Sequence, residues 1–167
     1  MLHRYGVFFV AHNKNDEMHL NATAALTSSV LGWFGKAYTS SYVIDETLTL
    51  AKAKLGGPEA RRLAESILQS KKITRVNVDE EESTFQDSFA RFKEHLDVRG
   101  LSFTDCTTLV LSERLKIGTL VSFDSGFRPF VPMLLGEGYY RSLPRERRDL
   151  LAKIAQKLGI KLKSPKP

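Results

Sequence analysis

The sequence is poor in cysteine and has no long hydrophobic run. Cys106 is the only cysteine among the 167 residues, so the chain cannot form an internal disulfide. It has no stretch of about 20 apolar residues that could span a membrane, and no basic segment followed by an apolar one at its start. We therefore expect a protein of the reducing cytoplasm that does not attach to a membrane.

Repeats and low-complexity linkers are also missing, and 42% of the residues are hydrophobic. A chain of this length buries roughly 70% of the surface that its unfolded form exposes, which is enough for a substantial core. One compact domain is the simplest organisation.

Positive charge is concentrated near the C-terminus. Residues 141–167 contain nine Lys or Arg and two acidic residues, a net charge of +7, so residues 1–140 carry a net of −1 against +6 for the whole chain. Apolar residues at helical spacing, with Ser142 as the cap, predict a basic C-terminal helix and tail over 141–167. Its arginines and lysines form either a solvated face or a surface that binds the phosphates of an acidic polymer.

Helical and strand-like segments alternate along the first 140 residues. AYTSSYVI and ITRVNVD have the composition of strands, and TLVSF, residues 119–123, is apolar on both faces, as in the interior of a parallel sheet. Phe85, Phe89 and Phe92 mark an amphipathic helix and are expected in the core. This alternation predicts an α/β fold with a central parallel sheet flanked by helices.

Three acidic residues fall where such a fold carries its functional groups. Asp105 opens an apolar helix that Ser102 or Thr104 can cap, Asp124 ends the strand 119–123, and Glu46 lies on an early turn of the helix that follows the strand near 37–40. Taken singly, Asp105 offsets the helix dipole and Asp124 makes a turn. Taken together, clustered carboxylates need a hard divalent cation such as Mg²⁺ or Mn²⁺.

The segments SSYVIDETLTL and LSFTDCTTLVLSERLKIGTLVSFDSGF resemble the PIN-domain family, in particular the VapC-type toxins of prokaryotic toxin–antitoxin pairs. The match consists of a helix glutamate, an S-x-x-D helix start and a strand-end aspartate followed by phenylalanine. The resemblance implies a Rossmann-like fold over residues 1–140 and a Mg²⁺- or Mn²⁺-dependent endoribonuclease. It makes Glu46, Asp105 and Asp124 the catalytic, metal-binding residues, with RNA as substrate, an antitoxin as partner and a homodimer as the assembly.

One departure from the family puts the activity in question. Members begin with a short strand that ends in an aspartate, and in HRYGVFFVAHNKNDEMH that place falls on Arg4 or Tyr5. Either the start of the gene is assigned too late, or activity is lost, or another acid substitutes. The alternatives are a catalytically weakened PIN-like module that binds RNA or protein, and a receiver-like signalling domain with Asp105 or Asp124 as phospho-acceptor.

The remaining candidate ligands and nucleophiles have simpler explanations. His12 and His19 lack the spacing of a metal motif, so packing or solvent roles are expected. Cys106 is expected to be a small buried apolar residue rather than a nucleophile.

Overall fold

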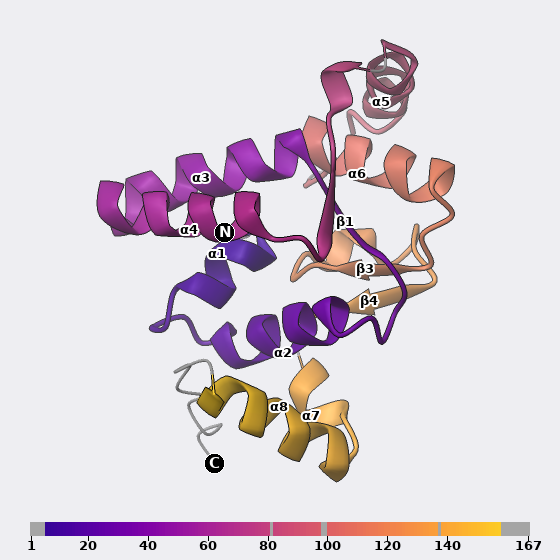
Figure 1. Ribbon diagram of the computed structural model, residues 1–167. Coiled ribbons are helices and arrows are strands. Elements are labelled where there is room, and N and C mark those ends of the chain that lie inside the picture. The colour runs from indigo at the N-terminus through magenta and orange to yellow at the C-terminus, as the bar shows by residue number, and fades with distance from the viewer. Residues whose placement is uncertain (1–5, 81, 98–99, 137, 158–167) are drawn as a thin grey trace.

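The computed structural model describes residues 6–80, 82–97, 100–136 and 138–157. In these ranges helices predominate, and four short strands lie between them (Figure 1). The helices are α1 Val7–His12, α2 His19–Val30, α3 Ser41–Leu55, α4 Gly57–Gln69, α5 Glu82–Glu94, α6 Phe103–Arg114, α7 Tyr139–Ser142 and α8 Arg145–Lys157. None of the helices in these ranges is both long and apolar enough to cross a membrane.

The strands pair in parallel, which confirms the predicted α/β class. β1, Ala37–Ser40, pairs in register with β2, Ile73–Val76, and the α3–α4 hairpin forms the crossover between them. β3, Thr119–Val121, pairs with β4, Met133–Leu135. Within the described ranges these are two separate two-stranded sheets rather than one continuous sheet. Because all pairing is parallel, the carboxyl ends of the strands in each pair point the same way.

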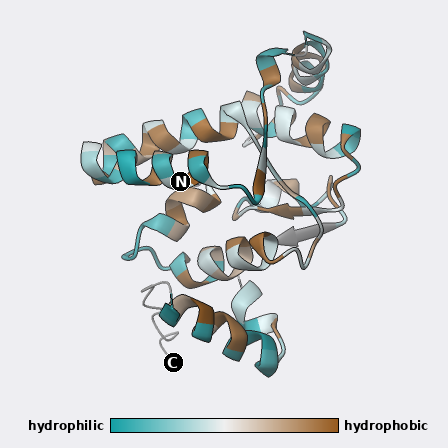
Figure 2. Cartoon of the chain, in the orientation of Figure 1, coloured by the Kyte–Doolittle hydropathy of each residue, from teal (hydrophilic) through white to brown (hydrophobic). Residues whose placement is uncertain are grey.

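Two hydrophobic clusters hold the helices around the strands. The first joins α1 to α2, α3 and α4, with Phe9 and Val10 each 2% exposed at its centre. The second joins α2 to α7 and α8, where Leu151 is also 2% exposed. Figure 2 shows hydrophobic and hydrophilic positions alternating along α8, as expected for a helix with one buried face. The basic helix is therefore packed on α2, and the division of the chain at residue 140 stays a prediction.

The predicted start of this last helix is wrong. Ser142 is the final residue of α7, and its hydroxyl donates to the carbonyl of Tyr139 at 2.7 Å. α8 begins only at Arg145, directly after Pro144. Proline is well suited to that place because it fixes φ and needs no hydrogen-bond acceptor for an N–H group.

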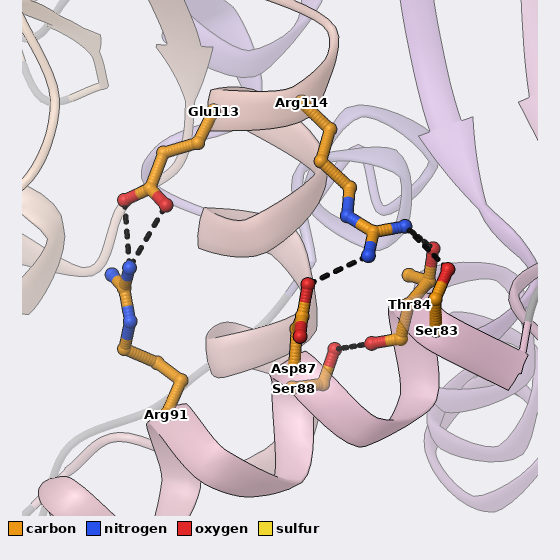
Figure 3. A network of polar contacts seen from close by, with 7 residues as sticks. All are labelled: Ser83, Thr84, Asp87, Ser88, Arg91, Glu113 and Arg114. Carbon is orange, nitrogen blue, oxygen red and sulfur yellow. Dashed lines mark hydrogen bonds and ion pairs between the residues drawn. The ribbon is translucent and has the colours of Figure 1, made fainter.

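The predicted burial of the α5 phenylalanines is also wrong for two of the three. Phe85 and Phe89 are 41% and 44% exposed, whereas Thr84 and Ser88 on the neighbouring face are completely buried. Helix α5 packs on α6 partly through polar groups, which Figure 3 shows. The rings of Phe85 and Phe92 do pack on Phe103, the first residue of α6, at 5.4 and 5.9 Å between ring centres. Amphipathic spacing therefore predicted the helix and its contact correctly, but not how far its phenylalanines are buried.

Candidate active site at the carboxyl ends of the strands

A cavity of about 220 Å³ lies between the two strand pairs. All residues of β1 and β3 line it, together with the residue that follows β3, Ser122. Glu46, Asp105 and Asp124 line the same cavity. The three predicted acids therefore line one cavity, although they come from three separate parts of the chain.

Asp105 is positioned by the start of α6. Ser102 is the N-cap, and its hydroxyl oxygen accepts a hydrogen bond from the Asp105 N–H at 3.1 Å. In return, Oδ2 of Asp105 accepts from both the N–H and the hydroxyl of Ser102, each at 2.7 Å. This reciprocal pair is a capping box, which satisfies backbone donors that the first helical turn leaves without partners. Asp105 is thus rigidly oriented, half-buried and at the positive end of a helix.

Asp124 is positioned by the turn after β3. Its N–H donates to the Ser122 hydroxyl at 3.0 Å, and its Oδ1 accepts from the Gly126 N–H at 2.8 Å. The second contact starts the short 3₁₀ turn Ser125–Phe127. Phe127 is buried, so this turn is anchored to the core and fixes the direction of the half-buried Asp124.

Glu46 lies on α3, which begins directly after β1. Ser40, the last residue of β1, caps the helix by accepting a hydrogen bond from the Val43 N–H at 3.2 Å. Glu46 itself is exposed, while its neighbour Thr47 is 2% exposed and faces the core. Glu46 also borders a second, open hollow that includes Tyr42 and Phe103.

Sharing a cavity is not the same as forming a ready ligand set. In the described part of the chain, no three His, Cys, Asp or Glu side chains lie close enough together to hold a metal ion. The fourth family position falls on Arg4 or Tyr5, which lie outside the described residues. The chemistry of the side chains that line the cavity suits a hard cation, because carboxylates and hydroxyls offer oxygen ligands. The assignment of Glu46, Asp105 and Asp124 to metal binding or catalysis stays a prediction.

Two features of the site were missed from the sequence. Ser122 lines the cavity and orients Asp124, and Gly136 approaches Ser122 so closely that an added Cβ would lie 2.3 Å from the Ser122 carbonyl oxygen. Their positions in the sequence could have indicated both residues, since Ser122 directly follows β3 and Gly136 directly follows β4. A hydroxyl residue and a glycine at the ends of strands are typical of a site where two backbone segments approach each other closely.

The histidines and the cysteine have structural surroundings. His12 on α1 contacts the Glu59 carboxylate on α4 at 2.9 Å, which lowers the pKa of Glu59. His19 is 3% exposed, and its Nδ1 lies 3.3 Å from the carbonyl oxygen of Val10. Cys106 is fully buried; burial raises the pKa of its thiol, and the charge of Asp105 raises it further. A raised thiol pKa disfavours the nucleophilic thiolate, in keeping with a packing role.

Comparison with known proteins identifies the family. A sequence profile of the PIN domain matches residues 7–130, so the chain belongs to the PIN domain family. Among characterised relatives it is similar to the VapC ribonuclease of Archaeoglobus fulgidus, with 30% identity over 155 residues, covering 93% of this chain and 94% of the relative.

Among solved structures, the chain is similar to VapC20 of Mycobacterium tuberculosis, described as a toxin that cleaves the sarcin–ricin loop. The TM-score is 0.65 and the identity 24%, covering 76% of this chain and 93% of the other. At this identity the likeness supports the fold alone. The resemblance and the PIN-like fold expected from the sequence are both confirmed.

Proposed function

We propose that this protein is a PIN-type endoribonuclease that depends on Mg²⁺ or Mn²⁺ and acts as the toxin of a toxin–antitoxin pair. The observation that carries the proposal is that Glu46, Asp105 and Asp124 all line one cavity, which runs beside β1 and β3. Membership of the PIN family and similarity to a VapC ribonuclease support the substrate class, RNA. The cytoplasm is the expected compartment, and a small antitoxin protein and a second copy of the chain are the expected partners.

The three carboxylates would hold the cation, each presented by a different local device. A divalent cation in such a site activates water against a phosphodiester and offsets the charge of the phosphate. The contribution of the chain is to fix the acids: the capping box holds Asp105, the turn at Gly126 holds Asp124, and α3 presents Glu46. Because a helix cap and a tight turn hold Asp105 and Asp124, little reorganisation of these two carboxylates would be needed during a reaction.

Glu46→Gln is the sharpest test, because Glu46 is exposed and plays no part in a helix cap. We expect metal-dependent cleavage of RNA to fall by two orders of magnitude or more, about the loss seen when one electrostatic contact is removed from an active site. The matched control is Asp45→Asn, since Asp45 is exposed on the same helix but points roughly 100° away and does not line the cavity. Equal activity of both variants and the unaltered chain would contradict the proposal.

The first family position decides how active the chain is. With Arg4 or Tyr5 in place of an aspartate, one negative ligand is missing, and affinity for Mn²⁺ should be low because coulombic attraction is reduced. We expect Arg4→Asp, or failing that Tyr5→Asp, to tighten Mn²⁺ binding in isothermal titration calorimetry and to raise cleavage. An in-frame aspartate upstream of Met1 in the gene would point to a late start assignment instead. Tight Mn²⁺ binding and robust cleavage by the unaltered chain would show that this ligand is dispensable.

A catalytically weakened module that binds RNA is the second candidate, and the basic α8 favours it. Its three arginines at the N-terminal end, here called the α8 arginines, are Arg145, Arg147 and Arg148. Each already has a contact. Arg147 lies 4.7 Å from the centre of the Trp33 ring, Arg148 donates to two backbone carbonyls, and Arg145 lies 3.9 Å from the Asp149 carboxylate.

RNA binding through these side chains would weaken as salt is raised, because each neutralised phosphate releases counterions. Replacing the α8 arginines together by glutamine should lower RNA affinity and flatten its dependence on salt. The comparison is with Arg61→Gln and Arg62→Gln on α4, whose side chains are 81% and 65% exposed. Unchanged binding after the α8 substitutions would mean that α8 is a solvated helix without a role in RNA binding.

A further inference from the structure

The open hollow beside the candidate active site has two aromatic rings in its lining. Tyr42 and Glu46 line it from α3, and because they are four residues apart they lie on one face of that helix. Phe103 and Thr104 line it from the start of α6. Glu46 and Thr104 also line the cavity that contains the other two candidate acids. The hollow therefore adjoins the candidate active site.

The two rings are held in place by their own chain. The Phe103 ring packs on Phe85 and Phe92 of α5, at 5.4 and 5.9 Å between ring centres. The Tyr42 ring lies 6.0 Å from Phe103, and its hydroxyl donates to Oδ1 of Asp79 at 2.9 Å. Both residues are only half-buried, so part of each ring stays accessible from the hollow. A surface that is already ordered binds a flat ligand with little further loss of conformational entropy.

We propose that Tyr42 and Phe103 form a stacking subsite for one unpaired base of the RNA substrate, next to the site of cleavage. Proteins recognise single-stranded RNA largely by stacking its bases on aromatic side chains, since every base offers a flat face. The inference rests on the proposed function, because that function makes RNA the ligand. It adds the part of the substrate that the hollow binds and the residues that bind it.

The charges around the hollow favour a base over the other parts of RNA. Glu46 is exposed there, and its carboxylate would repel a phosphate but not a neutral base. Burial raises the pKa of the Tyr42 phenol, and the hydrogen bond to Asp79 raises it further, so the ring stays uncharged near pH 7. The Thr104 hydroxyl can both donate to and accept from the edge of a base. Asp45 also borders the hollow, but stacking needs no charge and assigns it no part.

Two octamers with equal numbers of phosphates test the subsite, one an oligouridylate and the other an abasic strand. Fluorescence anisotropy in EDTA, where no metal-dependent cleavage occurs, gives their dissociation constants, and the ratio of the two measures what the bases contribute. For the unaltered chain we expect the oligouridylate to bind at least fivefold more tightly, roughly the smallest effect that stacking one base produces. Equal binding of the two strands, or binding of neither, would overturn the proposal.

Substitutions at Tyr42 distinguish stacking from simple apolar contact. Tyr42→Phe keeps the ring and should keep the affinity ratio, whereas Tyr42→Leu keeps apolar bulk without an aromatic face and should bring the ratio close to one. Phe89→Leu is the matched control, since Phe89 is 44% exposed on α5 and does not line the hollow, and it should leave the ratio unchanged. Circular dichroism and sedimentation velocity follow the fold and the association state. A folded Tyr42→Leu variant that keeps the full ratio, or that changes only the association state, would overturn the proposal.

Failure of the ribonuclease proposal gives a different result. Glu46→Gln should lower metal-dependent cleavage but keep the affinity ratio, because stacking does not use the charge of Glu46. Loss of the ratio in Tyr42→Leu together with undiminished cleavage in Glu46→Gln would support the stacking subsite and refute the role of Glu46 in catalysis.

Discussion

Gly136 gives the most direct test of how the candidate site is built. It is buried directly after β4, and a Cβ placed there would lie 2.3 Å from the carbonyl oxygen of Ser122 and 3.6 Å from the Cα of Phe123. Ordinary contacts of a Cβ begin at 3.4 Å, so the backbone at Ser122 would have to move by about 1 Å. The atom in the way belongs to the backbone, which cannot rotate aside as a flexible side chain would.

We therefore expect Gly136→Ala to destabilise the fold by about 1–3 kcal/mol, the usual cost of overpacking. For a chain of this size that cost lowers the midpoint of thermal unfolding by roughly 2–12 °C. The displacement falls on Ser122, whose hydroxyl orients Asp124. Because a misplacement of 1 Å can cost a factor of about 100 in rate, any RNA cleavage should fall by more than the loss of folded protein explains.

Gly118→Ala is the matched control. Gly118 precedes β3, has no atom within 4 Å of an added Cβ and does not have a positive φ. Alanine there should be neutral or should stabilise by about 0.4–1 kcal/mol, because it restricts the unfolded chain. Differential scanning calorimetry of both variants gives the comparison. If Gly136→Ala proves as stable as Gly118→Ala, the close approach of β4 to Ser122 is wrong, and so is the account of how Asp124 is positioned.

Two further predictions concern the packing around α6. Arg114→Met should destabilise the fold by about 1–2 kcal/mol in urea unfolding, because it removes donors to buried Thr84. Arg61→Met, which breaks an exposed ion pair, should change the free energy of unfolding far less. Equal costs of the two substitutions would contradict the polar anchoring of α5. The Cys106 thiol should react with a disulfide reagent only as fast as the protein unfolds, since it is fully buried and its pKa is raised; a rapid reaction in native buffer would contradict this.

Much of the fold could be predicted because its signals are local. The start of α6 is encoded within Ser102–Asp105, where the cap and its reciprocal acceptor are three residues apart. Parallel pairing followed from strands that alternate with helices, since a parallel pair requires a crossover. Contacts between residues from distant parts of the chain were harder to predict. Phe85 and Phe89 of α5 were expected in the core, because periodicity shows that a helix has an apolar face but not how deeply that face is covered.

The candidate site could likewise be predicted only in part. That Asp105 and Asp124 border the same cavity could be predicted from their positions at a helix start and a strand end of an α/β fold, and both line it together with Glu46. The roles of Ser122 and Gly136 could not be predicted from the sequence. They depend on the approach of β4 to the end of β3, and 11 residues separate the two strands in the chain. The separation of the strands into two pairs was likewise not foreseen, since it concerns long-range pairing rather than local pattern.

From the sequence, Asp105 can serve the start of a helix or bind a metal ion. Substitutions at this position distinguish the two roles. The cap needs an acceptor for the Ser102 N–H, which an asparagine oxygen also provides, whereas holding a cation needs the negative charge. Asp105→Asn should therefore keep most of the stability, while Asp105→Ala should lose about 1 kcal/mol. If Asp105 serves only the cap, RNA cleavage should persist in the asparagine variant. If it is also a ligand, both variants should lose cleavage, even though chemical unfolding separates their stabilities.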